Sequence, residues 1–215
     1  MTRTISTFNK DSFEKICKKL ARQDTHLGDI ISRYGFPPMW TRPATFQTLI
    51  LTILEQQVSL AAAYAAFKKL KEKIGYVTPT KLLQLTDEEM RACYFTRQKM
   101  GYARGLALAI QSKKIVLKKF STLPDEEVRN ELIQLKGIGN WTIDVYLMHA
   151  LQRTDLFPLG DIALVNSLKE TKGLPKDISK EEMLAIAEPW RPYRTIASMI
   201  LWHSYIKKRN IKLQG

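Results

Sequence analysis

Leu135-Lys136-Gly137-Ile138-Gly139-Asn140-Trp141-Thr142 is the stretch of sequence that decides the fold. Two glycines bracket one apolar residue, an apolar run of helical period precedes them, and a second helical run follows. Glycine tolerates positive φ and lets the backbone approach a partner closely. The second helix starts at about Asn140. Its free N–H groups and the positive end of its dipole therefore face any ligand that contacts the turn. The stretch therefore predicts two helices joined by a tight turn, which is either a plain connection or a phosphate site.

Composition and charge narrow the class of partner. The chain has 215 residues, enough for one large domain or two small lobes. Apolar residues make up 45% and charged residues 26%, which is ordinary for a globular protein. The 34 Lys and Arg against 21 Asp and Glu give a formal net charge of +13. Such an excess favours a polyanionic partner, nucleic acid first and an anionic membrane second, with a solubilising surface as the alternative.

Cysteine and histidine usage indicates no metal or disulfide chemistry. Cys17 and Cys93 lie far apart in apolar helical contexts and are typical of small core residues in a reducing compartment. Two cysteines are too few for a four-cysteine iron–sulfur site, and the three histidines are isolated. Residues 1–10 have no apolar signal region, and no stretch has the apolar length to span a bilayer. We expect an intracellular, cytoplasmic protein, nucleoid-associated if bacterial.

Apolar residues recur at helical spacing along the whole chain, and no segment alternates with period two. This pattern predicts an all-α protein of about ten to twelve helices. One of them, beginning near Phe46, is apolar on more than one side and leads into Glu55-Gln56-Gln57-Val58-Ser59. Two neutral amides directly after a buried helix are unusual, because a buried amide needs hydrogen-bond partners.

Asp161 follows the two-glycine turn by about twenty residues, at the mouth of a predicted helix. One interpretation is an ordinary N-cap, which sequence reasoning alone favours. The other is a catalytic carboxylate, since one helix and one loop are enough to bring the chain back to the turn. The two interpretations are compatible.

Large aromatic rings are concentrated outside regular structure. Trp40, Trp141, Trp190 and Tyr193 all fall in loops or at helix starts, whereas Trp202 is assigned to the core. Bases extruded from a DNA duplex are held by stacking on such rings. Packing into a hydrophobic core is the alternative for each ring taken singly.

Four segments together resemble the helix-hairpin-helix DNA glycosylase superfamily, and within it the alkylbase branch of the 3-methyladenine DNA glycosylase II type. They are the two-glycine stretch, Phe157-Pro158-Leu159-Gly160-Asp161, Ile53-Leu54-Glu55-Gln56-Gln57-Val58-Ser59, and the segment from Ala187 to Arg194. The resemblance covers roughly residues 40–207. It implies a two-lobed helical bundle with a central DNA- and base-binding cleft. The expected lobes are residues 40–120 and residues 1–39 with 121–215.

The resemblance also implies roles for individual residues. Asp161 becomes the catalytic carboxylate, and Gln57, preceded by Gln56, enters the duplex in place of the flipped nucleotide. The phosphate-binding hairpin consists of Gly137, Ile138, Gly139, Asn140 and Thr142. The backbone carbonyls of Ile133, Leu135 and Ile138 are expected to hold a structural monovalent cation, Na⁺ or K⁺. No cofactor is expected for the chemistry.

The base pocket implied by the resemblance consists of Trp141, Tyr193, Trp40 and Trp190. Trp141 stands where the bifunctional branch has its nucleophilic Lys, so a Schiff base cannot form there and the enzyme is expected to be monofunctional. Tyr193 replaces a tryptophan and Val145 replaces a tyrosine of the best-known bacterial relative, which leaves the range of bases open. That relative also has an N-terminal α/β domain that a chain of this length does not accommodate.

The implied function is a monofunctional DNA glycosylase of base excision repair. It would flip alkylated purines, such as 3-methyladenine and 7-methylguanine, out of double-stranded DNA and hydrolyse the N-glycosidic bond. We expect a monomer without a membrane partner. Two alternatives remain: a non-catalytic DNA-binding protein that uses the hairpin alone, and a bifunctional glycosylase/lyase, whose nucleophile would be Lys136 on the wrong side of the hairpin.

Overall fold

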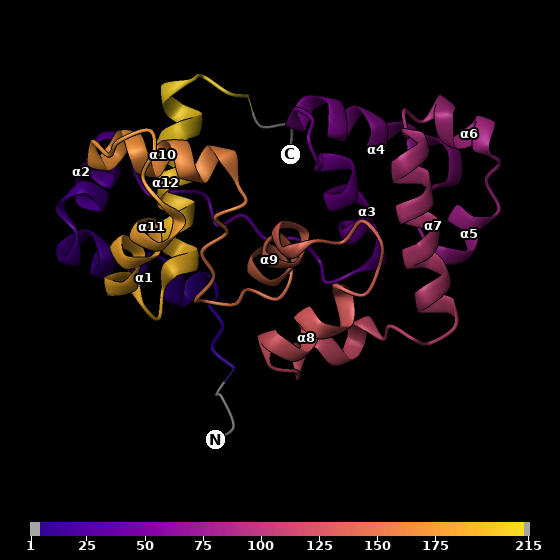
Figure 1. The fold of residues 1–215 in the computed structure, drawn as a ribbon, viewed down its shortest axis with the longest axis horizontal. Coiled ribbons are helices and arrows are strands. Elements are labelled where there is room, and N and C mark those ends of the chain that lie inside the picture. The colour runs from indigo at the N-terminus through magenta and orange to yellow at the C-terminus, as the bar shows by residue number, and fades with distance from the viewer. Residues whose placement is uncertain (1–4, 213–215) are drawn as a thin grey trace. The chain divides into compact units, whose positions relative to one another are not determined.

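The chain is helical throughout the part that its computed structural model describes, residues 5–212 (Figure 1). This range contains no strand beyond a single bridge between Thr7 and Arg153, which confirms the all-α prediction. The twelve α-helices of this range are α1 (Lys10–Gln23), α2 (Thr25–Tyr34), α3 (Phe46–Glu55), α4 (Leu60–Ile74), α5 (Pro79–Leu83), α6 (Asp87–Ala92), α7 (Arg97–Gln111), α8 (Asp125–Leu132), α9 (Asn140–His149), α10 (Ile162–Lys172), α11 (Lys180–Ala187) and α12 (Arg194–Lys208). Two 3₁₀ helices, η1 (Leu117–Ser121) and η2 (Glu188–Trp190), complete the set.

Local sequence sets many of the helix boundaries. Asn9, Thr86 and Ser179 begin α1, α6 and α11 with reciprocal capping boxes, in which the cap side chain and the third helical residue satisfy each other's N–H groups. Gly173 ends α10 in the left-handed conformation that favours glycine. The starts expected near Phe46 and Asn140 agree with the observed starts of α3 and α9.

The helices pack into two compact units. Unit 1 contains Arg42–Tyr146, and unit 2 contains Ser6–Thr41 and Leu147–Lys212. The division differs from the lobes expected from the sequence, because residues 121–146 pack with residues 42–120. The contacts that join them include the Phe120 and Tyr146 rings, whose centroids are 6.3 Å apart, and a hydrogen bond from Gln56 to Gly137.

Unit 1 is built on α3. Nine of its ten residues are buried, which agrees with the prediction of a helix that is apolar on more than one side. Helices α4 and α7 pack against α3, and α5 packs against α7 (Figure 1). The apolar faces of α4 and α7 are rich in alanine, and these small side chains permit close approach between helices.

Unit 2 is built on α12. Its residues from Thr195 to Ser204 are all buried, and α1, α2 and α10 pack around it (Figure 1). The amphipathic helix α1 turns Phe13, Ile16, Cys17 and Leu20 towards this core. Its opposite face is left to solvent.

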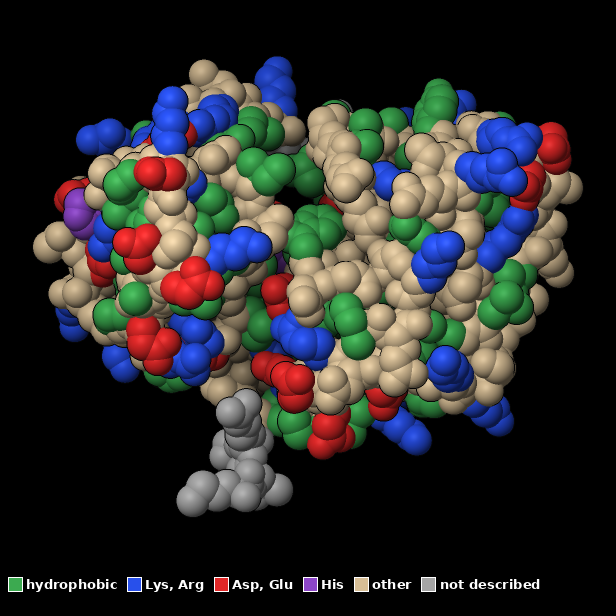
Figure 2. Space-filling model, viewed as in Figure 1, with side chains coloured by type: hydrophobic (Ala, Val, Ile, Leu, Met, Phe, Trp, Pro, Cys, Tyr) green, Lys and Arg blue, Asp and Glu red, His purple; other side chains and the backbone are tan. Residues whose placement is uncertain are grey.

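Basic side chains are spread over the visible surface of each unit, with acidic side chains among them (Figure 2). No helix within residues 5–212 has both the length and the apolar character needed to cross a membrane.

Candidate functional site

The two-glycine stretch forms a tight connection between α8 and α9 in unit 1. Ile138 is 3% exposed, so its side chain anchors the turn in the core, while Gly139 and Asn140 are exposed. Arg129 of α8 ties the two helices together, donating to Asn140 Oδ1 at 2.9 Å and to Asp144 Oδ1 at 2.5 Å. Burial raises the pKa of Asp144, although Arg129 acts in the opposite direction. The turn therefore presents the first N–H groups of α9 from a rigid frame.

The two glycines of the hairpin have different structural roles. Gly137 has φ of 87°, and a Cβ atom placed on it would lie 2.1 Å from the Tyr102 ring of α7. Both the conformation and the close approach require glycine there. At Gly139 a Cβ would meet nothing within 4 Å, and the residue has no positive φ. Open space in front of Gly139 is what a close approach of an external phosphate needs.

Gln56 and Gln57 are separated by the structure. Gln56 Nε2 donates to the carbonyl of Gly137 at 2.8 Å and to Thr142 Oγ1 at 3.0 Å, so its amide braces the hairpin. Thr142 is 1% exposed, which means that its side chain serves this brace rather than an external ligand. Gln57 is exposed and has φ of 56°, a left-handed conformation that is uncommon for a residue other than glycine. Of the two predicted intercalating residues, Gln57 is therefore the one free to project from unit 1.

A partly buried ion pair fixes the end of α3 that carries these amides. Arg42 donates to both carboxylate oxygens of Glu55, at 2.8 and 2.6 Å, and Glu55 is 7% exposed. Burial opposes the charge of Arg42, but the hydrogen bonds and charge of Glu55 outweigh it, so the pKa of Arg42 is raised. Lys99 of α7 donates to the carbonyl of Leu54 at 2.7 Å, and burial lowers the pKa of Lys99.

Trp141 and the predicted cation ligands lie within the same hairpin. Trp141 is half-buried in the first turn of α9. Ile133, Leu135 and Ile138, whose carbonyls are the predicted ligands, all lie in the six-residue segment 133–138 between α8 and α9. The carbonyl of Leu135 accepts the N–H of Ile138 at 3.0 Å, and a carbonyl has a second lone pair. These carbonyl ligands are of the type that binds K⁺ in proteins, so the donor set fits a monovalent cation.

Asp161 caps α10 in unit 2. Its Oδ1 accepts the N–H of Leu164 at 2.8 Å, which confirms the N-cap interpretation. The same oxygen accepts the indole N–H of Trp202 at 2.9 Å. Two donors on one oxygen fix the orientation of a half-buried carboxylate at the positive end of a helix. Such a carboxylate is positioned to stabilise a developing positive charge.

An aromatic cluster surrounds this carboxylate–indole pair in unit 2. The ring of His149 stacks on Trp202, with centroids 5.6 Å apart and an interplanar angle of 27°. His149 Nδ1 lies 2.8 Å from the carbonyl of Trp40, and the Trp40 ring lies 6.4 Å from that of His203. Trp40 is half-buried. The predicted pocket residue Trp40 and the predicted catalytic Asp161 are thus linked through Trp202 and His149.

The other two predicted pocket aromatics of unit 2 differ in accessibility. Tyr193 precedes α12 and is half-buried, with the ammonium of Lys19 lying 4.9 Å from its ring centroid. Trp190 is 1% exposed, and its indole N–H donates to Asp24 Oδ2 at 2.8 Å. Phe157 packs against its ring at 5.8 Å. The structure places Trp190 in the packing of unit 2, which corrects its expected role in a base pocket.

Sequence reasoning missed three contributors to this arrangement. Trp202 is buried, as assigned, but its N–H donor is directed to a residue 41 positions earlier. The bracing role of Gln56 reaches 81 positions along the chain, and the close contact of Tyr102 with Gly137 links two separate helical segments. The unusual pair of amides after a buried helix was the available signal for Gln56.

The chain matches a described protein family over residues 50–192. That family is the HhH-GPD superfamily of base excision DNA repair proteins. A match of this extent covers the end of α3, the hairpin, Asp161 and most of the segment before α12.

Two fission yeast comparisons and one bacterial comparison give the scale of the similarity. DNA-3-methyladenine glycosylase 1 of Schizosaccharomyces pombe is 29% identical over 91% of this chain and 92% of its own length. The solved structure of 3-methyladenine DNA glycosylase of that yeast in complex with abasic DNA superposes with a TM-score of 0.83 at 27% identity, covering 94% of this chain and all of the other. A Bacillus subtilis relative is 29% identical over 84% of this chain, which spans 66% of that relative's length.

Proposed function

The chain belongs to the HhH-GPD superfamily of base excision DNA repair proteins, and from this premise we propose that it is a monofunctional DNA glycosylase of the 3-methyladenine type. Its substrate is double-stranded DNA that carries alkylated purines, and its reaction is hydrolysis of the N-glycosidic bond. The proposal depends on one observation: the N–H groups of Leu164 and of the Trp202 indole hold the carboxylate of Asp161 at the start of α10. As a repair enzyme it acts on the chromosome as a monomer.

Binding begins with the phosphates. The hairpin N–H groups around Gly139 hold a backbone phosphate without reading sequence, because the space before that residue is open. Gln57 enters the duplex as the damaged nucleotide rotates out, and its exposed left-handed position at the end of α3 supports this role. Gln56 is a positioning residue for the hairpin.

The extruded base is held by stacking. Trp40 and Tyr193 of unit 2 are the rings that we assign to this task, and each is half-buried, so each keeps an accessible part. In unit 1, Trp141 is half-buried as well, and its part in stacking stays a prediction from the sequence. A purine alkylated at N3 or N7 carries a positive charge, which the faces of aromatic rings attract. The same charge makes the base a good leaving group, so little acid catalysis is needed.

The chemistry is a substitution at C1′ of the sugar. The bond between C1′ and the purine nitrogen breaks with its electron pair going to the base, and the oxygen of a water molecule bonds to C1′. Asp161 stabilises the oxocarbenium-like sugar between these events and takes up the proton of the attacking water. Trp141 occupies the position of the lyase nucleophile and carries no amine, so the strand remains intact.

The hairpin carbonyls of Ile133, Leu135 and Ile138 would hold a Na⁺ or K⁺ ion, which supplies positive charge next to the bound phosphate. Replacing K⁺ by tetramethylammonium at constant ionic strength tests this part of the proposal. We expect weaker binding of the duplex without a change in the rate of hydrolysis at saturating enzyme. Equal binding in both salts would contradict a cation at the hairpin.

One assay tests the activity. The protein is incubated with methylated duplex DNA, and released base is measured, followed by strand breaks with and without alkali. We expect free methylated purines and breaks that require alkali. No released base would contradict the enzyme, and breaks without alkali would contradict its monofunctional character.

A matched pair of variants tests the site. Asp161→Asn is expected to abolish release and to retain DNA binding. Asp177→Asn makes the same change of charge at an exposed position of unit 2 and is expected to retain wild-type activity. Full activity of Asp161→Asn would show that the site is assigned wrongly.

A further inference from the structure

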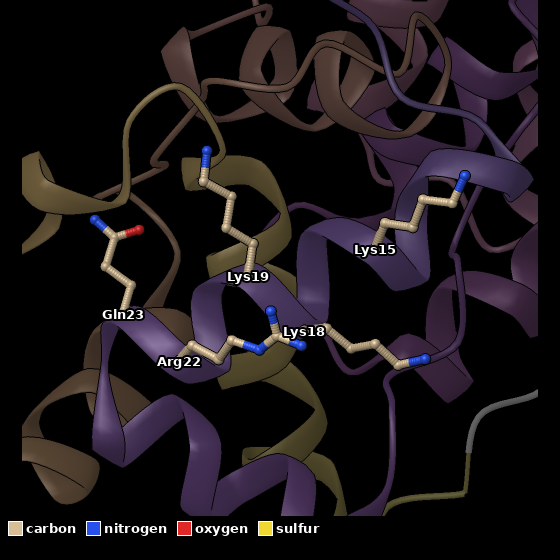
Figure 3. A pocket seen from close by; sticks show the side chains of 5 residues that line it. All are labelled: Lys15, Lys18, Lys19, Arg22 and Gln23. Atoms are coloured by element: carbon tan, nitrogen blue, oxygen red, sulfur yellow. The ribbon is translucent and has the colours of Figure 1, made fainter.

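The solvent face of α1 carries a stripe of four cations. Lys15, Lys18, Lys19 and Arg22 recur at helical spacing opposite the buried face of the helix, and with Gln23 they line one open hollow of unit 2 (Figure 3). No carboxylate lines this hollow. We propose that this stripe binds the phosphate backbone of DNA, as a second anchoring surface besides the hairpin; the inference rests on the proposed function for the identity of the polyanion.

The stripe keeps most of its positive charge. Within residues 5–212 its one ion pair joins Lys18 to Glu14 at 2.6 Å, and both side chains are more than half exposed. An exposed pair of this kind contributes little stability and is readily exchanged for another anion. No carboxylate of the described chain pairs with Lys15, Lys19 or Arg22.

The lysine-rich helix α4 differs from the stripe, because carboxylates of unit 1 neutralise part of its positive charge. On α4, Lys68 lies 3.9 Å from Glu72, and Lys73 lies 2.9 Å from Glu89 of α6. The basic end of α4 is therefore partly neutralised by its own unit. The stripe on α1 lacks an equivalent set of acids, so an external anion is the available counter-charge.

The spacing of the stripe favours a backbone over a small anion. Figure 3 shows that the ends of the side chains spread along α1 and do not converge on one point. The Cα atoms of Lys15 and Arg22 are seven residues apart, or about 10 Å along a helix. Phosphates of one strand recur at about 3.4 Å along a duplex axis, so the stripe matches about three of them.

Lys19 connects the stripe to the proposed base pocket. Its ammonium lies 4.9 Å from the centroid of the Tyr193 ring in the same unit. A strand that follows the stripe would draw the Lys19 ammonium to a phosphate and uncover this ring for an extruded base. The surface therefore serves the strand next to the flipped nucleotide rather than a remote segment of DNA.

The experiment compares two charge-matched triple variants of the full chain. Lys15→Gln, Lys18→Gln and Arg22→Gln remove three charges from α1 and leave Lys19 in place. Lys68→Gln, Lys69→Gln and Lys71→Gln remove three charges from α4. Binding to an undamaged duplex is measured as a function of salt, and circular dichroism and the Tm establish that both variants are folded.

We expect the slope of log affinity against log salt to fall in magnitude by about 2 to 3 in the α1 variant, because each phosphate contact contributes about 0.9. The α4 variant is expected to keep the wild-type slope. An unchanged slope in the α1 variant would overturn the inference, and an equal fall in both variants would overturn it too, by showing an effect of net charge alone. Base release by the wild-type protein is measured in parallel, so failure of the proposed activity is distinguishable from failure of this surface.

Discussion

The indole N–H of Trp202 donates to Oδ1 of Asp161 at 2.9 Å. Trp202 lies in α12, the central helix of unit 2, and its ring stacks on His149. A buried aromatic ring has few orientations, so the donor is held in place before any substrate binds. The pair explains how a carboxylate at the edge of a helix keeps a fixed orientation.

Trp202→Phe keeps most of the ring and removes the donor. A hydrogen bond to a charged group contributes about 1.5 to 3 kcal/mol, and about 1.4 kcal/mol corresponds to tenfold in rate. We expect the rate of base release at saturating enzyme to fall by about ten- to a hundredfold, with duplex affinity unchanged. Single-turnover kinetics and a binding titration measure the two quantities separately.

Trp190→Phe is the control for this variant. It deletes the same type of bond in the same unit, from a buried indole to Asp24. Both variants are expected to lower the Tm, and the loss of rate is expected for Trp202→Phe alone. An equal loss of rate in both would mean that Trp202 acts through the stability of unit 2 and not through Asp161.

Substitution of the two hairpin glycines by alanine is expected to have opposite effects on stability and on duplex affinity. In Gly137→Ala the new methyl group would overlap the Tyr102 ring and the backbone would be strained, so we expect a loss of stability of about 2 kcal/mol or more. In Gly139→Ala the methyl group meets open space, so the Tm is expected to hold while duplex affinity falls. Thermal melts and binding titrations of both variants check this. A stable Gly137→Ala protein, or full affinity of Gly139→Ala, would contradict the assignment.

Local features of the fold could be predicted from the sequence because their causes are local. Helical periodicity located α3, and the pattern at Asp161 placed a cap that the structure confirms. Only the cap interpretation of Asp161 is confirmed, and the same oxygen also accepts the indole N–H of Trp202. Its catalytic role stays a prediction.

Contacts between distant segments could not be predicted, because no periodic pattern encodes them. The brace from Gln56 to Gly137 and the bond from Trp202 to Asp161 each join separate helical segments. The same limit explains Trp190: its loop-like sequence context favours a pocket, but in the structure its indole N–H donates to Asp24. Likewise, the expected lobe boundary missed the packing of residues 121–146 with unit 1.

Asp24 makes the stability of unit 2 sensitive to acid. Burial raises its pKa, but hydrogen bonds from Lys172, at 2.6 Å, and from Trp190 outweigh burial, so the pKa is lowered in the folded state. A lowered pKa stabilises the fold above the unfolded value of about 3.9, and this contribution is lost as pH falls below it. Asp24→Asn should therefore reduce the Tm at pH 7 and lose that deficit as pH falls below about 4. A deficit that persists undiminished at pH 2 to 3 would contradict the role of this charge.

Gln57 has an exposed side chain and a left-handed backbone conformation. A substitution there can therefore remove the side chain that enters the duplex without lowering the stability of the fold. Glycine adopts φ of 56° without the cost that other residues bear there, which is about 1 kcal/mol. Gln57→Gly is therefore expected to retain its stability or gain up to about 1 kcal/mol, while base release falls at least tenfold because nothing fills the gap in the duplex. Gln56→Leu is the comparison: it removes the brace to Gly137 and Thr142, so the Tm and duplex affinity are expected to fall together. Chemical denaturation and base release on one methylated duplex measure both variants. Wild-type release by Gln57→Gly would exclude Gln57 as the residue that replaces the flipped nucleotide.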